Sequence, residues 1–462
     1  MCVESQKNIW SPNRHKEPGH ITVSEANTDE KENKYEFKKP NGGYGWIILL
    51  AISLNNFILV GVMYSFGIVL KEIKSHFDIP QEQANLLQSL NVGFLFLSGP
   101  LTSALSNLFG CRLVIMFSGL VFSLMYFLCA FLPSFYMMLF SFGVIGGLCY
   151  GLTYLTGFNI LVDYFDKKFG LAMGLSSAAS GLGSFAFAPF TKFLINNYGW
   201  KITMIVLGFV VFLCCLSSLF LRPIDYYKKK FNNSVELENL TNKSEPKSSD
   251  SKSKIFNFFS ELINFSLLKT NKIFLFIFMS NFFVFFAYYI PFIYIPIRAQ
   301  ELGITHYAWI ISIMGIGNIP MRIMFGFLSD KKFLRTIEMN TICLFLAMGL
   351  LFVYYFLNSF NLQVVFGVLF AIPMAGINCL AAPYLVDAVG SSNFRNANGV
   401  VNLSRGFGAV FGPYVAGLIS EKTGSILYSF IFAGCSFMIG FLFSFCASAF
   451  TRKQKNIENS TQ

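Results

Sequence analysis

Charged residues are scarce in this sequence. Asp, Glu, Lys and Arg make up 13% of its 462 residues, against about 25% in an ordinary soluble domain. Hydrophobic residues make up 54% and 56 residues are phenylalanine, so a soluble globular protein is excluded. Apolar runs of roughly 18 residues or more cross a hydrocarbon core as helices, and the absence of short alternating segments excludes a membrane β-barrel. The sequence therefore predicts an all-α membrane protein.

Residues that carry covalent chemistry are also few. The four histidines lie outside the centres of the apolar runs, and there is no nucleotide-binding loop and no serine–histidine pairing. The ten cysteines show neither a disulfide framework nor a metal-ligand spacing. We therefore expect that the protein is not an enzyme and has no catalytic residue, no metal site and no cofactor.

Twelve apolar segments are long enough to cross a bilayer, which makes the lipid bilayer the first expected partner. The first 44 residues are polar, so no cleavable signal peptide is expected there. The predicted spans are roughly 45–70, 82–105, 111–132, 135–162, 168–193, 199–221, 271–297, 305–328, 335–357, 361–387, 395–419 and 424–449.

Lysine and arginine predict the orientation. An even number of spans puts both tails on one side, and the tails and loops of that side hold 27 basic residues. The loops of the other side hold six: Lys71, Lys74, Lys192, Lys201, Arg298 and Lys422. Because loops rich in Lys and Arg stay in the cytoplasm, we expect both termini there. The net charge of +11 follows from this bias, so nucleic-acid binding is not expected.

A polar segment rich in Asn, Ser, Lys and Glu separates two sets of six spans. The tripeptide LVD ends the fourth and tenth spans, at Leu161–Asp163 and Leu385–Asp387, and a proline follows each aspartate by 26 residues. Such repeats indicate duplicated bundles with the solute path between them. The predicted divisions are an N-terminal tail (1–44), a six-helix bundle (45–222), a central loop (223–270) with an interfacial helix at 255–269, a second six-helix bundle (271–450) and a C-terminal tail (451–462).

Glycines gather in the fourth, fifth and eleventh spans. Small residues one turn apart let helix backbones approach closely. This pattern fits static packing and also fits a surface that slides during alternating access, and the sequence leaves both open.

Two arginines lie inside spans. Inserting an ionisable side chain there costs free energy, so each arginine is expected to have a functional or structural role. Arg322, in the eighth span, is predicted to bind solute or act in a gate, and the alternative is an internal ion pair or a clamp on backbone carbonyls within the C-terminal half. Arg405, in the eleventh span, is as well explained by a structural or gating pair. Asp387, at the end of the tenth span, is a predicted partner of either arginine.

Neutral polar side chains extend the predicted cavity. Asn318 precedes Arg322 by one helical turn and shares its face. Asn378 in the tenth span and Tyr64 in the first are further candidates, although a buried asparagine often only bonds to a neighbouring helix.

Several motifs together resemble the monocarboxylate porter family of the major facilitator superfamily, over about residues 38–450. The first span opens with PNGGYGW (40–46), similar to the family's acidic-Gly-Gly-Trp-Gly-Trp signature, with Asn41 and Tyr44 as departures. The sequence YFDKKFGLAMGLSSAASGLG (164–183) is close to the second signature. Supporting matches are GPLTSALSNLFGCR (99–112), FSLLK (265–269) and RGFGAVFGPYVAG (405–417).

The resemblance implies a twelve-helix carrier of monocarboxylates or related solutes, commonly at the plasma membrane, and in some members an accessory single-span glycoprotein. Its proton-coupled members resemble one another in a lysine of the first span and an Asp-x-x-x-Arg of the eighth. Here Tyr64 stands at the lysine position and Asn318 at the aspartate, while Arg322 is kept. A pocket phenylalanine and a serine correspond to Met374 and Asn378.

Because asparagine does not titrate and tyrosine titrates near pH 10, these departures favour a proton-independent facilitative carrier. Its solute would be polar, aromatic or carboxylate-bearing, such as an aromatic amino acid, a thyroid-hormone-like compound, carnitine or creatine. The alternative is a proton-coupled lactate or pyruvate symporter in which Asp387 or Asp163 binds the proton. A second alternative is a non-transporting membrane sensor or scaffold, which saturable uptake would remove.

Overall fold

The computed structural model describes residues 39–222, 266–304, 308–331 and 333–460, apart from some side chains within helices. These residues form helices and no strand, so the all-α prediction is confirmed. Most of the predicted interfacial helix, Phe265 of the FSLLK motif and most of the N-terminal tail lie outside the described residues. In chain order the elements are α1 (Tyr44–Phe77), α2 (Gln81–Leu97), α3 (Gly99–Phe109), α4 (Cys111–Phe131), α5 (Phe135–Met138), the π-helix η1 (Leu139–Gly146), α6 (Gly147–Tyr164), α7 (Phe169–Ser217), the short 3₁₀-helix η2 (Ser218–Phe220), α10 (Ser266–Thr270), α11 (Lys272–Tyr288), α12 (Ile290–Glu301), α13 (Ala308–Asp330), α14 (Thr336–Tyr354), α15 (Phe360–Thr423) and α16 (Leu427–Ser460).

The two longest helices each hold two predicted spans. Helices α7 and α15 have 49 and 64 residues, and straight helices of that length would measure roughly 74 and 96 Å, more than twice a hydrocarbon core. Each is broken at a glycine with φ 77°, Gly199 in α7 and Gly390 in α15. Glycine allows the chain to reverse there because a side chain is strained in this backbone region.

Eight helices in the described residues are long and apolar enough to span a membrane, or nine if the bent pair α2 and α3 counts as one span. The breaks in α7 and α15 raise this number by two, and α13 occupies the position of the predicted eighth span. The structure therefore contains the twelve predicted spans.

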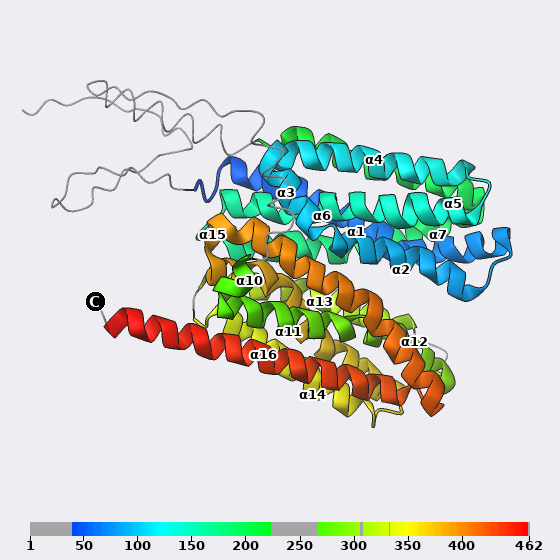
Figure 1. The fold of residues 1–462 in the computed structure, drawn as a ribbon. Coiled ribbons are helices and arrows are strands. Elements are labelled where there is room, and N and C mark those ends of the chain that lie inside the picture. The colour runs from blue at the N-terminus through cyan, green and yellow to red at the C-terminus, as the bar shows by residue number, and fades with distance from the viewer. Residues whose placement is uncertain (1–38, 223–265, 305–307, 332, 461–462) are drawn as a thin grey trace, which may run out of the picture.

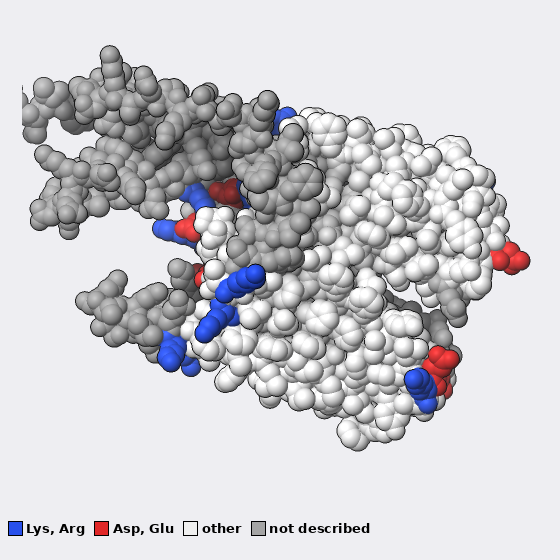
Figure 2. Space-filling model, in the orientation of Figure 1, with Lys and Arg blue, Asp and Glu red and all other residues white. Residues whose placement is uncertain are grey.

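Helices α1–α7 form one half of the molecule and α10–α16 the other, and the halves lie side by side (Figure 1). Both halves begin and end at one face, which we call the tail face. There the Tyr44 hydroxyl donates to the Phe220 carbonyl at 2.8 Å, and Arg452 pairs with Glu338 at 3.0 Å. Figure 2 shows charged residues at the two ends of the molecule and an uncharged band between them, as expected for a bundle that crosses a bilayer.

Close backbone contact joins the halves near the tail face. A Cβ atom on Gly170 of α7 would lie 2.6 Å from the carbonyl oxygen of Gly326 in α13, and one on Gly399 of α15 would lie 2.8 Å from the carbonyl oxygen of Gly99. Real Cβ atoms essentially never approach within 3.0 Å, so only glycine allows these approaches. Other glycines, such as Gly412 beside the Phe286 backbone, serve packing inside one half.

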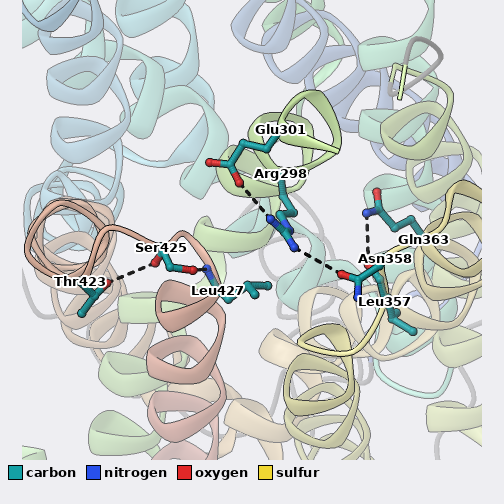
Figure 3. A network of polar contacts seen from close by, with 8 residues as sticks. All are labelled: Arg298, Glu301, Leu357, Asn358, Gln363, Thr423, Ser425 and Leu427. Carbon is teal, nitrogen blue, oxygen red and sulfur yellow. Dashed lines mark hydrogen bonds and ion pairs between the residues drawn. The ribbon is translucent and has the colours of Figure 1, made fainter. Parts of the chain in front are cut away.

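At the opposite face, one group of polar contacts lies within the second half (Figure 3). Arg298 at the end of α12 pairs with Glu301 at 3.2 Å and donates to the Asn358 side chain at 3.3 Å. The Gln363 amide donates to the Leu357 carbonyl at 3.3 Å. These contacts fix the loop between α14 and α15 without linking the two halves.

Candidate functional site

A cavity of about 110 Å³ lies between the halves, deep in the bundle. Residues of α1, α2, α6 and α7 line it from the first half, and residues of α11, α13 and α15 line it from the second. Four of the predicted residues are brought together on its wall: Tyr64, Arg322, Asn378 and Arg405. A solute held here would contact both halves, as alternating access requires.

Arg322 is held across the interface between the halves. Its Nη1 donates to the Ser177 carbonyl and to the Ser180 hydroxyl of α7, both at 2.6 Å. Its Nε donates to Asn318 Oδ1 at 2.5 Å, so the predicted proximity of Asn318 and Arg322 is realised as a direct bond. Asn318 itself does not line the cavity and acts by orienting the guanidinium.

Arg405 is held within the second half. Its Nε donates to Asn281 Oδ1 at 2.9 Å, its Nη1 to Asn402 Oδ1 at 3.3 Å and its Nη2 to the Tyr384 hydroxyl at 3.5 Å. The guanidinium carbon lies 4.9 Å from the centre of the Phe285 ring, within cation–π range. All of these partners are neutral.

The charge of the two arginines is therefore not compensated locally. Among the described residues that line the cavity, none is Asp, Glu, Lys or His. Arginine stays ionised at all physiological pH values, so the cavity wall carries two positive charges. Such a site attracts anions and repels cations.

Aromatic side chains make up seven of the other 18 lining residues, and the sequence analysis did not identify them. The Asn378 amide donates to the Tyr288 hydroxyl at 2.6 Å, which links the predicted Asn378 to this wall. The other aromatic lining residues are Phe96, Tyr150, Tyr154, Phe158, Phe285 and Tyr289. In a chain with 56 phenylalanines and 20 tyrosines, no sequence signal separates these rings from the lipid-facing ones.

Met374 is a correction to the sequence analysis. Its side chain is fully buried in the hydrophobic core of the second half and does not line the cavity. Only its carbonyl is near the site, where it accepts from the Asn378 amide at 3.0 Å. A flexible apolar thioether gains more from close packing than from facing a polar cavity.

The predicted pairing of Asp387 with Arg322 or Arg405 is also wrong in this conformation. Asp387 is exposed near the tail face and accepts a hydrogen bond from the Thr336 hydroxyl at 2.6 Å. The two arginines lie deeper, on the cavity wall, and an aspartate side chain is too short to reach them.

Asp163 does form an ion pair, with a partner that the sequence analysis did not consider. Arg395 at the start of the eleventh span reaches across the interface to Asp163 in α6 and also contacts Asn107. Nearby, the Asn398 amide donates to Asn159 Oδ1 at 3.2 Å. These bonds join the halves between the cavity and the tail face.

Asp330 makes a second connection between the halves at the tail face. Its two carboxylate oxygens accept from the backbone N–H groups of Gly170 and Leu171, at 2.7 and 2.8 Å. These donors lie in the first turn of α7, where the helix dipole favours a negative charge. In the part of the chain that the structure describes, hydrogen bonds join the halves at Arg322 and, toward the tail face, at Asp163, Asp330, Asn396 and Asn398. The halves are thus joined at the tail face.

The two signature motifs meet at this face. Asn41 Oδ1 accepts from the backbone N–H groups of Asp166 and Lys167, at 2.7 and 2.8 Å. The Trp46 ring packs edge-on against Phe165, with centroids 5.5 Å apart. Asn41, which replaces the acidic residue of the family signature, thus still provides a side-chain oxygen that accepts these hydrogen bonds. At the tail face itself, a second cavity of about 1010 Å³ opens between the ends of the halves, and Asp330 and Asp387 are among its lining residues.

A family model described as the Major Facilitator Superfamily matches residues 52–389 of the chain. Monocarboxylate transporter 2 from Homo sapiens is 26% identical over 445 residues, covering 92% of this chain and 91% of that protein. Monocarboxylate transporter 12 from Xenopus laevis is 28% identical over 428 residues, covering 89% of this chain and 91% of that protein.

Solved structures share the fold. The proton:xylose symporter XylE superposes with a TM-score of 0.67 and 14% identity, covering 88% of this chain and 96% of that one. FucP in the outward conformation superposes with a TM-score of 0.63 and 13% identity, covering 87% of this chain and 99% of that one.

Proposed function

From the premise that this chain belongs to the major facilitator superfamily, we propose that it is a secondary carrier for a small carboxylate-bearing solute, moved by alternating access without proton coupling. The function is transport rather than covalent chemistry. The observation that carries the proposal is the cavity between the halves, where Arg322 and Arg405 face no acidic side chain among the described lining residues.

The identity of the lining side chains supports an anionic solute. A carboxylate pairs with guanidinium N–H groups through charge-assisted hydrogen bonds, which are about twice as strong as neutral ones. Relatives named monocarboxylate transporters agree with this class of solute. The cavity volume of about 110 Å³ favours small carboxylates over the larger aromatic candidates in this conformation.

No Asp, Glu or His lines the described cavity wall, which supports transport without protons. Tyr64 and Asn318 stand where the proton-coupled relatives are expected to have a lysine and an aspartate, and neither titrates near neutral pH. Asp163 and Asp387, the proton sites of the symport alternative, lie outside the cavity wall.

The positive-inside bias supports a tail face in the cytoplasm and a multi-pass location, which we place at the plasma membrane. In that orientation the halves are joined on the cytoplasmic side, which supports an outward-facing conformation. The proposal also includes an accessory single-span glycoprotein as a partner, as the family resemblance implies.

The test is uptake of labelled lactate, butyrate, succinate, an aromatic amino acid and carnitine by cells that express the protein, at outside pH 6 and 7.5. We expect saturable carboxylate uptake that changes little with pH, because arginines do not titrate in this range. Arg322→Ala should abolish it, whereas Arg452→Ala, at an exposed ion pair of the tail face, should not. Surface expression is measured for each variant.

Two results would contradict the proposal. Uptake of lactate that rises several-fold at outside pH 6 would favour proton symport. Absence of saturable uptake of any of these solutes, with the protein at the surface, would favour the sensor or scaffold.

A further inference from the structure

We propose that the cavity is built for a dianion, a short dicarboxylate, and that Arg405 is the residue that selects two negative charges over one. This inference rests on the proposed function, because it assumes that the cavity is the solute site. It differs from that function in the charge of the solute and in the role given to Arg405.

The first support is the charge of the cavity wall. Two guanidinium groups line one small cavity, and none of the described lining residues carries a negative charge. Tyr154 of the first half lines the same cavity as both arginines, so one solute in this cavity is exposed to both charges. A monoanion would leave one arginine charge uncompensated inside the bundle, whereas a dianion neutralises both.

The second support is the number of guanidinium N–H groups that are left without an acceptor within the protein. Each guanidinium has five. Three N–H groups of Arg322 are used by Asn318, Ser177 and Ser180, and Nη2 has no acceptor among the described residues. Arg405 donates three bonds, one each from Nε, Nη1 and Nη2. Each arginine therefore keeps two N–H groups, enough for one carboxylate apiece.

The third support is how the arginines are held. Their partners are asparagine amides, serine and tyrosine oxygens and a backbone carbonyl. These groups fix the guanidinium planes while leaving the charges free for a ligand. Arg322 lies on α13 and Arg405 on α15, so two carboxylates of one solute would link two helices of the second half.

The cavity size agrees with a short solute. A volume of about 110 Å³ equals roughly three to four water molecules at about 30 Å³ each. Met63, Phe96 and Phe285 on the wall provide apolar contact for a short methylene chain between the two carboxylates.

A purely structural role is the competing explanation for Arg405, because its guanidinium stacks on Phe285 and donates hydrogen bonds to Asn281 and Tyr384. The two roles differ in what a substitution changes. If Arg405 is only structural, its loss lowers uptake of every solute in the same proportion. If its charge selects the solute, its loss changes the ratio of dicarboxylate to monocarboxylate uptake.

Succinate and butyrate test this, since they have the same number of carbons and differ by one carboxylate. We would measure kcat/KM for both in proteoliposomes at pH 7.5, with wild type, Arg405→Gln and Arg405→Lys. Wild type should prefer succinate, and Arg405→Gln should lower the succinate-to-butyrate ratio about 10- to 100-fold, the effect of losing hydrogen bonds to a charged group. Arg405→Lys, which keeps the charge, should retain most of the preference.

A wild type that takes butyrate as well as succinate, or an Arg405→Gln variant with an unchanged ratio, would overturn the inference and leave the proposed function standing. Uptake of neither solute would overturn the inference, and uptake of lactate, an aromatic amino acid and carnitine would then decide the proposed function separately. Misfolding of Arg405→Gln is detected by its chromatographic profile, and Asn402→Asp, which places a carboxylate beside Arg405, then provides the same test by a predicted fall in the ratio.

Discussion

The glycine contact between α7 and α13 gives a prediction about conformational equilibrium. A Cβ on Gly170 would lie 1.7 Å from Ser329 Oγ, 2.6 Å from the Gly326 carbonyl oxygen and 2.9 Å from Asp330 Oδ1. The serine side chain can rotate, but the carbonyl belongs to the backbone of α13. Gly170→Ala therefore forces the two helices apart by roughly 1 Å, since ordinary carbon contacts are about 3.5 Å.

This separation lengthens the bonds that Asp330 accepts from Gly170 and Leu171, now 2.7 and 2.8 Å. A hydrogen bond to a charged group contributes about 1.5–3 kcal/mol, and water replaces part of it once the helices separate. A net loss of about 3 kcal/mol shifts the equilibrium roughly 100-fold toward conformations open at the tail face.

The assay is the alkylation rate of a cysteine placed on the cavity wall, Ala381→Cys, with an impermeant reagent added at the tail face. Labelling of that peptide is followed by mass spectrometry, which separates it from the native cysteines. We expect Gly170→Ala to raise the rate by up to about 100-fold.

The matched controls are Gly315→Ala and Gly349→Ala, where an added Cβ meets nothing within 4 Å. They should leave the rate unchanged and, as helical Gly-to-Ala changes, add up to about 1 kcal/mol of stability. An unchanged rate in Gly170→Ala would refute the argument that this contact closes the tail face.

Three further predictions concern charge. Asn402→Asp should lower uptake of anionic carboxylates about 10- to 100-fold by pairing with Arg405, and an undiminished rate would contradict the role of that charge. Asp163→Asn should weaken closure at the tail face by about 1 kcal/mol, because its partly exposed pair with Arg395 is screened; cysteine alkylation should rise about fivefold, and no rise would show that the pair does not hold the closure. Solute inside vesicles should accelerate uptake, because an empty site with two uncompensated charges closes less readily than a loaded one; equal rates with and without internal solute would contradict this.

Much of the fold was predictable because it depends on local composition. Apolar length, the polar centre of the chain and the approximate boundaries between the predicted spans are properties of neighbouring residues. The bond between Asn318 and Arg322 was also within reach, since residues four apart share a helix face.

The partners of the charged residues were not predictable in the same way. Asp163 and Arg395 are 232 positions apart, and Asn281 reaches Arg405 from a different helix. Asp387 was expected beside an arginine because opposite charges attract, but its depth in the bundle places it with Thr336 instead.

Hydrophobic length and charge inside apolar segments are properties of short stretches, so the amino-acid sequence was enough to establish many membrane spans and two arginines within them. Tertiary structure alone decided that Arg322 and Arg405 line one cavity, that Met374 does not, and that the halves join at the tail face. Those facts depend on how helices distant in sequence pack and rotate against one another, and a single sequence does not encode that packing in any local pattern.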